Sequence, residues 1–299
     1  MYGMGDEFEY MRCGTCGCQQ IMEVPPDLGR YYPPDYYSYA PTPLRGLRRV
    51  VTSLRNKSYF KRTPAALVGK LIAAALPNPK VAAVARVNPA TDARILDVGC
   101  GYGELLMELR GVGFTRLCGI DPYIAADVEP CDSVVIRKME MDELGGDAFD
   151  VIMMHHVFEH LADPVTALRS VRGLLAPAGI CIIRIPVADS WASRHYGALW
   201  VQHDAPRHLF LHTEKSMQCV AAEAGLRIER VVYDSSEAQI WGSELYRRDM
   251  PLRSVPLSIY GNPIRRLLSP EFRRYRAAAR RLNRQGQGDQ AAFYLGRVN

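Results

Sequence analysis

Three glycines stand directly after a strongly apolar segment and before a segment with helical spacing. The sequence ILDVGCGYGELL at residues 95–106 places Gly99, Gly101 and Gly103 in the pattern G-x-G-x-G. Glycine lets the backbone approach a ligand without a clash from a β-carbon. The pattern differs from the dinucleotide signature G-x-G-x-x-G, and it lacks the Lys-Ser/Thr of a phosphate loop. It therefore indicates either another ligand at this loop or a tight turn between strand and helix.

Acidic residues stand on both sides of the glycine loop, at positions suited to binding a nucleoside. Asp97 precedes the loop, and Asp121 ends the strand predicted at residues 116–121. A carboxylate at the end of this second strand can accept hydrogen bonds from both hydroxyls of a ribose. Glu140, in the acidic turn after the third predicted strand, could accept from an adenine amino group while Met141 packs against the ring. Together these residues indicate a ligand that contains a nucleoside.

Two clusters of histidines could perform acid–base chemistry, because the ordinary pKa of imidazole lies near neutral pH. The first cluster follows the fourth predicted strand and consists of His155, His156, Glu159 and His160. The second runs from Trp200 to Leu209 in a long segment without strand or helix pattern. In both clusters the histidines could instead be hydrogen-bonded loop residues, and the first cluster could also be a divalent metal site.

The elements that must position these residues alternate between strand and helix from Arg94 onward. Such alternation is typical of a mostly parallel sheet with helices on both faces. We therefore expect an α/β protein. The predicted strands cover residues 94–98, 116–121, 133–138, 149–155, 180–186, 226–234 and 291–297, and the predicted helices cover 103–113, 163–179 and 213–225.

Composition excludes several classes of protein. The chain has 299 residues, 48% of them hydrophobic, and a net charge of +5, which excludes global disorder. It shows no apolar run of about 18 residues and no secretory signal, so we expect a cytoplasmic protein with reduced thiols. Lys and Arg concentrate at residues 45–80 and 265–284, and the remainder of the chain is acidic. A uniformly basic nucleic-acid binder is therefore excluded, whereas a local anion site is not.

Three cysteines lie close together near the N-terminus. Cys13 and Cys16 form a C-x-x-C pair, and Cys18 follows. A structural zinc ion takes four ligands, so this set is incomplete. Either the segment binds no metal, or another chain completes the site.

Several motifs, taken in order, resemble those of a class I S-adenosylmethionine-dependent methyltransferase. They are Asp97 to Gly103, Gly119-Ile120-Asp121, Phe149-Asp150-Val151 and Glu159 to Pro164. The resemblance covers about residues 90–234, with the last strand rejoining at 291–297. It implies a Rossmann-like, doubly wound sheet of seven strands whose last strand is antiparallel.

The resemblance also implies S-adenosylmethionine as cofactor. The glycines would line its methionine and ribose, Asp121 would hold the ribose, Glu140 and Met141 the adenine, and Asp97 the amino group. The full set of expected cofactor residues is Asp97, Gly99, Cys100, Gly101, Gly103, Asp121, Pro122, Glu140, Met141 and His155.

A hydroxyl acceptor needs a base to take its proton. His208, in Pro-Arg-His-Leu, matches a recurrent histidine of similar small-molecule methyltransferases, so we expect it to be the catalytic base, with His156 as the second candidate. The residues expected to contact the acceptor are Glu159, His160, Trp200, His203 and Arg207.

We expect three parts along the chain. Residues 1–42 hold the cysteines and a Tyr/Pro-rich stretch, and resemble the latter half of a zinc-knuckle region that precedes the domain in some sugar and polysaccharide methyltransferases. Residues 43–86 form a basic helical segment. Residues 87–299 form the methyltransferase domain, with insertions at 187–212 and 235–289.

These features predict methyl transfer to a small molecule or saccharide, most readily at oxygen, by in-line displacement. The basic segments could grip a phosphate- or lipid-linked acceptor, or contact a membrane surface peripherally. One alternative is a nucleic-acid methyltransferase. It is disfavoured because residues 155–158 read His-His-Val-Phe in place of Asn/Asp-Pro-Pro-Tyr/Phe. Another is a non-catalytic protein that uses the same fold for assembly.

Overall fold

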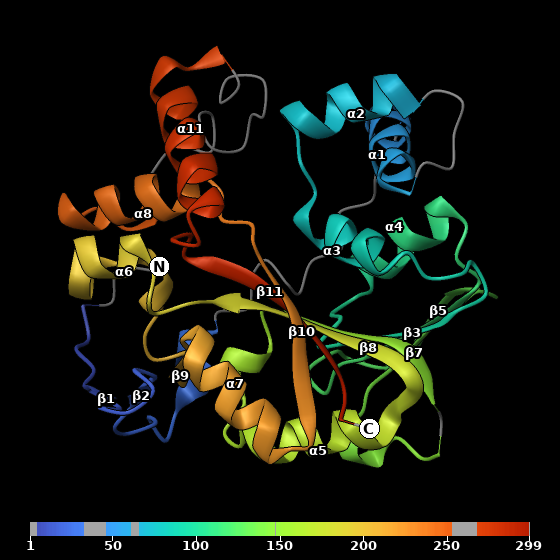
Figure 1. Ribbon diagram of the computed structural model, residues 1–299, viewed down its shortest axis with the longest axis horizontal. Helices are drawn as coiled ribbons and strands as arrows, with labels where there is room; N and C mark the ends of the chain where they lie inside the picture. Colours follow the sequence, from blue (N-terminus) through green and yellow to red (C-terminus); the bar gives the residue numbers. More distant parts are fainter. Residues whose placement is uncertain (1–4, 33–45, 61–65, 147, 253–267, 299) are drawn as a thin grey trace.

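The computed structural model describes residues 5–32, 46–60, 66–146, 148–252 and 268–298. One large sheet crosses the molecule, with helices on both of its faces (Figure 1). None of the helices in the described segments is long and apolar enough to cross a membrane.

The described part of the large sheet has eight strands in the order β10-β11-β8-β7-β3-β4-β6-β5. The five strands from β8 to β6 are parallel, and β11 is antiparallel to both of its neighbours. This confirms the predicted doubly wound α/β sheet with an antiparallel last strand. The strands span Arg94–Val98 (β3), Arg116–Ile120 (β4), Val128–Cys131 (β5), Val134–Arg137 (β6), Phe149–His155 (β7), Leu175–Pro186 (β8), Leu226–Tyr233 (β10) and Gln290–Arg297 (β11).

The predicted number of seven strands was wrong because β5 adds an eighth. It pairs antiparallel with β6 at the edge of the sheet, and none of its four residues is fully buried. It also contains Pro130, which cannot donate to a ladder and is tolerated only on edge strands. A short, half-exposed strand with a proline leaves no alternating pattern in the sequence.

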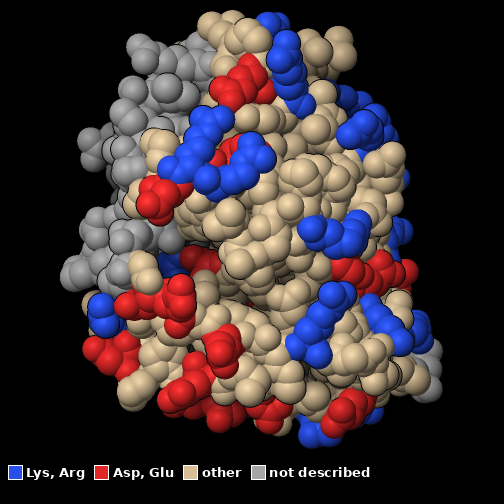
Figure 2. All heavy atoms as spheres, turned by 90° about the vertical axis from the view of Figure 1, so that its left-hand side faces the viewer, with Lys and Arg blue, Asp and Glu red and all other residues tan. Residues whose placement is uncertain are grey.

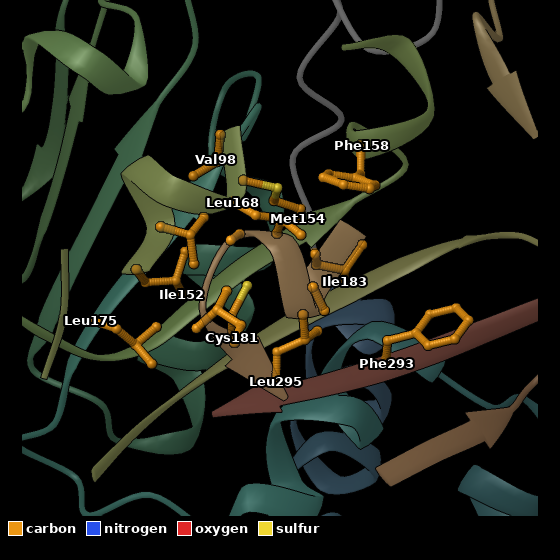
Figure 3. Close-up of a cluster of buried hydrophobic side chains, with 14 of the residues drawn as sticks. Val98, Ile152, Met154, Phe158, Leu168, Leu175, Cys181, Ile183, Phe293 and Leu295 are labelled. Atoms are coloured by element: carbon orange, nitrogen blue, oxygen red, sulfur yellow. The ribbon is translucent and has the colours of Figure 1, made fainter. Parts of the chain in front are cut away.

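Two hydrophobic clusters hold the helices against the two faces of the sheet. On one face, side chains from β7, β8 and β11 pack with helices α5 (Pro164–Leu174) and α7 (Glu214–Glu223). Figure 3 shows Met154, Ile183 and Phe293 within this cluster. On the other face, the cluster contains residues of α3 (Pro79–Val87) and α4 (Glu104–Val112). Burial on both faces explains why β7 reads as an apolar run rather than an alternating one.

Helix α5 begins as the sequence predicts but ends earlier. Asp163 accepts a hydrogen bond from the amide of Thr166, and Pro164 occupies the first turn. The helix ends at Leu174 rather than Gly179, because residues 175–179 already belong to β8. A β-carbon on Gly179 would lie 2.7 Å from the carbonyl oxygen of Phe149, so this glycine serves close packing of strands and not a helix end.

The N-terminal segment is joined to the first insertion. Strands β1 (Tyr10–Arg12) and β2 (Gln19–Ile21) form a small antiparallel sheet with β9 (Phe210–Leu211). A short helix, η1 (Leu28–Tyr31), follows β2. The remaining short helices of the insertion and of the loops before it are η3 (Met141–Glu143), η4 (Phe158–His160), α6 (Trp191–Tyr196), η5 (Gly197–Leu199) and η6 (Val201–His203).

Two pairs of helices lie in the upper half of Figure 1, one at its right and one at its left. One pair is α1 (Gly46–Tyr59) and α2 (Ala66–Ala75), as the basic segment predicted, and the other is α8 (Ala238–Arg247) and α11 (Pro270–Arg284). Figure 2 shows the side of the molecule on which α8 and α11 lie, with basic side chains in its upper part and along its right-hand side, and acidic side chains gathered mainly at the lower left. The uneven charge of the sequence is therefore also uneven in space.

Candidate functional site

A cavity of about 1590 Å³ opens at the carboxyl ends of β3, β4 and β7. This edge is where ligands bind in open α/β sheets. Its wall contains the glycine loop, the end of β4, η3 and the loop after β7. Helix α1 and residues 28–32 line the opposite side. The cavity therefore brings together the residues predicted to bind a nucleoside and the histidines that follow the fourth predicted strand.

The glycine loop has a backbone that other residues cannot readily adopt. The φ angles of Gly99 and Gly103 are +67° and +78°. A β-carbon on Gly99 would lie 2.5 Å from Cγ2 of Val157, and one on Gly103 would lie 2.4 Å from Cδ1 of Ile136. The glycines are thus required by the fold as well as by a ligand. Gly99, Cys100 and Gly101 line the cavity, whereas Gly103 caps α4 outside its wall.

Asp121 is fixed at the cavity wall by the backbone. One carboxylate oxygen accepts from the amide of Gly101 at 2.9 Å, and the other accepts from the amide of Tyr123 at 2.9 Å. Each carboxylate oxygen keeps a further lone pair for a ligand. The arrangement suits a pair of hydroxyl donors, and Pro122 lines the cavity beside it.

Asp97 and Lys80 form the inner end of the cavity. Asp97 is only 4% exposed, and burial raises its pKa to about 7. The positive charge of Lys80 opposes that rise, and the negative charge of Asp121 adds to it. Lys80 stands in the first turn of α3, after the cap residue Asn78, and lines the cavity. In the sequence, Lys80 stands out only as part of a basic segment. The Asn-Pro-Lys start of a helix just before the first strand was the signal that could have placed it.

Glu140 and Met141 line the cavity at η3, as expected for residues that would hold an adenine. Glu140 is the cap of this short helix, and its amide donates to the carboxylate of Glu143 at 2.6 Å. The turn is therefore held by a capping box, and the exposed side chain of Glu140 lies at the cavity wall.

His155 lines the cavity at the end of β7 and is 8% exposed. Neither ring nitrogen has a hydrogen-bond partner in the described part of the protein. Burial, with the charges of Lys80 and Arg184, lowers its pKa well below the ordinary value. A neutral imidazole with unused nitrogens is available to a ligand, in keeping with its expected place among the cofactor residues.

His156 also lines the cavity, but both of its nitrogens are engaged. Its Nδ1 lies 3.1 Å from Oε1 of Glu159. Its Nε2 lies 2.9 Å from a guanidinium nitrogen of Arg184 and 2.5 Å from the amide nitrogen of Gln290. Since both groups at Nε2 are donors, Nδ1 carries the hydrogen and donates to Glu159. Burial lowers the pKa of His156, although Glu159 opposes this.

The second histidine cluster lies behind the wall of the cavity. His160 lines the cavity, and the ring of His208 lies against it with centroids 4.9 Å apart, outside the wall. Trp200 is buried and donates to the carboxylate of Asp289 at 3.0 Å. His203 lies 3.0 Å from Oε1 of Gln19. These contacts pack the loop on the protein.

Arg207 lies in the same layer. Its guanidinium pairs with Asp204 and stands 5.7 Å from the centre of the Tyr32 ring. Tyr32 lines the cavity, whereas Arg207 does not. Catalysis by His208 and acceptor contacts from Trp200, His203 and Arg207 remain predictions.

The cysteines do not form a metal site with one another in the described segments. The one group there of at least three His, Cys, Asp or Glu ligand atoms close enough to hold an ion is Glu159, His160 and His208. Hydrogen bonds from the Cys16 and Thr15 amides lower the pKa of Cys13 to about 7, and burial raises that of Cys18 to about 11. A zinc ion at Cys13, Cys16 and Cys18, possible from the sequence only at an incomplete site, is not supported by the geometry of the described residues.

The far side of the cavity was missed by sequence reasoning. Helix α1 contributes Arg49 and Lys57, and η1 and its end contribute Leu28 and Tyr32. These residues are separated from the glycine loop by dozens of positions and carry no motif. Only the folded chain brings them together.

A family model described as a methyltransferase domain matches residues 61–231. A ubiquinone biosynthesis O-methyltransferase of Cereibacter sphaeroides is 31% identical over 137 residues, which are 40% of this chain and 52% of that protein. A protein of the same name from Parvibaculum lavamentivorans is 28% identical over 162 residues, covering 48% and 63%. A tRNA U34 carboxymethyltransferase of Shewanella frigidimarina is 29% identical over 115 residues, covering 34% of each chain. The match thus spans less than two thirds of each of these relatives.

Solved structures are also similar at low identity. A crystal structure of an S-adenosylmethionine-dependent methyltransferase from Thermotoga maritima has a TM-score of 0.46 and 15% identity, over 83% of this chain and 92% of that one. A mycolic acid cyclopropane synthase complexed with S-adenosylhomocysteine has a TM-score of 0.47 and 17% identity, over 79% and 87%.

Proposed function

The chain belongs to the class I S-adenosylmethionine-dependent methyltransferases, and on that premise we propose that it methylates a hydroxyl oxygen of a small molecule. One observation carries the proposal. A single cavity has a nucleoside-binding end at the glycine loop and an end lined by histidines that burial keeps neutral. The relatives named as O-methyltransferases support oxygen as the acceptor atom.

The inner end of the cavity fits the cofactor. Asp121 would accept from the ribose hydroxyls, and Asp97 would accept from the amino group. We add Lys80 as the partner of the methionine carboxylate, since its positive charge acts on Asp97 and it lines the same cavity. When bound, S-adenosylmethionine supplies a methyl group on a positively charged sulfonium.

The cavity has room for a second molecule. Ligand pockets commonly occupy about 300–1,000 Å³, and this cavity of about 1590 Å³ exceeds that range. The additional space lies toward α1 and Tyr32, which would close over the acceptor and exclude water. Arg49 and Lys57 on α1 favour an acceptor with an anionic group, such as a phosphate-linked saccharide.

The candidate bases differ in their readiness to take a proton. The Nε2 lone pair of His156 already accepts from Arg184, so His156 would have to give up that bond. His160 donates from Nδ1 to the carbonyl of Arg207 at 2.7 Å, which leaves its Nε2 lone pair unused by that bond. His208 lies behind His160 and would act through it or after a movement of the loop.

Methyl transfer to pooled acceptors tests the proposal. The protein and cofactor labelled at the methyl group are incubated in four parallel reactions, each with one acceptor pool. The pools are sugar nucleotides, lipid-linked saccharides, phenols and RNA. We expect base-stable label, as an ether, in one of the first three pools. Label in RNA alone would favour the nucleic-acid alternative. Cofactor binding without transfer to any pool would favour the non-catalytic one.

A further inference from the structure

Glu159, His160 and His208 converge beside the cavity in a way that the methyl transfer itself does not require. One potential ligand atom from each lies within 4.8 Å of the other two. Glu159 is 1% exposed, and its Oε2 has no hydrogen-bond partner in the described part of the chain. An ionised carboxylate is costly to bury unless it is paired or coordinates a metal. The cluster therefore contains a buried carboxylate oxygen, Oε2 of Glu159, without a hydrogen-bond partner in the described residues.

The two imidazoles are oriented by the backbone. Nδ1 of His160 lies 2.7 Å from the carbonyl oxygen of Arg207, and Nδ1 of His208 lies 2.8 Å from that of Gln202. A carbonyl can only accept, so Nδ1 carries the hydrogen in both rings, and in the neutral form each Nε2 keeps a lone pair. Histidines that bind metal ions almost always donate their other N–H to a carbonyl or a carboxylate. Both rings already have this second interaction.

The side chains that act on Glu159 are the imidazoles of His156, His160 and His208. Oε1 of Glu159 accepts from His156, a neutral donor, and lies 4.0 Å from Nε2 of His208. A second carboxylate, that of Asp204, lies 3.7 Å from the same Nε2. The carboxylate of Asp204 is already paired with the guanidinium of Arg207, so Glu159 is the carboxylate that an ion at Nε2 of His208 would meet.

We propose that Glu159, His160 and His208 bind a divalent transition-metal ion of the zinc class. Two imidazole nitrogens and one carboxylate oxygen are the donor set found in several catalytic zinc sites. The same set suits iron and manganese, and it suits magnesium and calcium poorly. This site is separate from Cys13, Cys16 and Cys18.

The position of the ion suggests its use. Because His160 lines the cavity, an ion held by it would lie at the acceptor end and could lower the pKa of an acceptor hydroxyl. This role rests on the proposed function, whereas ion binding does not. The binding test below therefore uses neither cofactor nor acceptor, so that the two proposals fail separately.

The test measures metal content and affinity directly. The full chain is stripped with chelator, titrated with Zn²⁺ in a calorimeter, and reconstituted with Co²⁺ for visible spectroscopy. We expect one ion per chain, and Co²⁺ bands typical of a site with fewer than six ligands. His160→Ala should weaken binding on the order of 100-fold or more, since it removes a ligand. Because His160 is half-buried, this variant should fold more reliably than a change at Glu159.

Matched variants separate this site from the alternatives. His195→Ala removes an exposed histidine that stacks on Trp191, away from the cluster, and should leave affinity unchanged. Replacing Cys13, Cys16 and Cys18 together by Ser should also leave it unchanged. The proposal is overturned if the chain binds no Zn²⁺, or if binding survives His160→Ala and is lost with the cysteines.

Discussion

The two ends of the cavity are built in different ways. The cofactor end takes Gly99, Gly101 and Asp121 from the ends of neighbouring parallel strands, and the backbone amide of Gly101 donates a hydrogen bond to the carboxylate of Asp121. The acceptor end joins residues from distant parts of the chain. The Gln290–His156 contact alone spans 134 positions, and α1 closes the space from the N-terminal side. A local backbone arrangement leaves a motif in the sequence, whereas an assembly of distant side chains leaves none.

The two ends also differ in the charge that they tolerate. At the cofactor end, burial raises the pKa of Asp97 to about 7, so this group resists ionisation until a positive ligand arrives. At the acceptor end, burial lowers the pKa of His155, His156 and His160, so these groups resist protonation. One end is prepared for a cation, and the other is kept neutral for accepting a proton or a metal ion.

The largest expected effect lies at the cofactor end. Asp121→Ala should weaken binding of S-adenosylmethionine on the order of 100-fold, because it removes a charged acceptor of two hydroxyl hydrogen bonds. Calorimetry measures the dissociation constant. Asp132→Ala, a change of an exposed acid that follows the edge strand β5 and lies outside the cavity wall, is the control and should bind as the wild type does. Equal affinity of the Asp121 variant would remove the basis for assigning this end to the cofactor.

Gly99→Ala should cost about 2–3 kcal/mol of unfolding free energy. The φ angle of +67° disfavours a β-carbon, which would also approach Val157 to 2.5 Å. Gly173→Ala in α5, where nothing lies within 4 Å of the added atom, should instead be neutral or slightly stabilising. Denaturant unfolding of both variants makes the comparison. Similar stabilities would show that the loop is not conformationally demanding.

Asp97→Asn should stabilise the protein without cofactor by roughly 2 kcal/mol at pH 8. The raised pKa means that the contribution of Asp97 is fully present below its ordinary pKa of 3.8 and is lost as the pH rises through about 7. That loss is roughly 4 kcal/mol, of which a buried amide recovers part. At pH 5 the stabilities of variant and wild type should converge, while cofactor affinity falls at both pH values. Unfolding curves with and without cofactor test this, and a variant less stable at pH 8 would contradict it.

The smallest expected effect is at the acceptor end. Wild-type His156 should titrate below pH 6.5 in an NMR experiment, and Gln290→Leu should move its pKa upward by less than about one unit. The leucine removes a donor that favours the neutral imidazole. Gln285→Leu, an exposed change after α11, should leave the titration unmoved. A wild-type pKa at or above 6.5 would refute the neutral acceptor end.

The fold was predictable where structure is local. The buried strand β3, the glycine loop and Asp121 follow from short-range patterns, and the alternation of strands and helices gave the parallel sheet. Strand β5 escaped because Pro130 and half-exposed neighbours leave no alternation. The end of α5 was misplaced because Gly179 serves strand packing, a tertiary requirement that resembles a helix stop in sequence.

The site was predictable to the same extent. Every expected cofactor residue except Gly103 lines the cavity, because one strand edge carries them all. Lys80 and Tyr32 could not be placed, because no local pattern tells which face of a helix or loop meets a cavity. The histidine loop was expected over the acceptor, but Trp200 and His203 are engaged by Asp289 and Gln19, and such partners are not visible in sequence.

The pairing of β2 with β9 has a consequence for how the chain reaches its final form. The hydroxyl of Tyr10 donates to the carbonyl of His208, 198 positions along the chain. During synthesis the pairing of β2 with β9 must therefore wait until most of the protein has been made. Contacts this distant in sequence slow folding, because the loop must be closed before the contact is gained. The layer that carries His208 should accordingly be the last part of the enzyme to mature, and the first to be lost when the N-terminus is shortened.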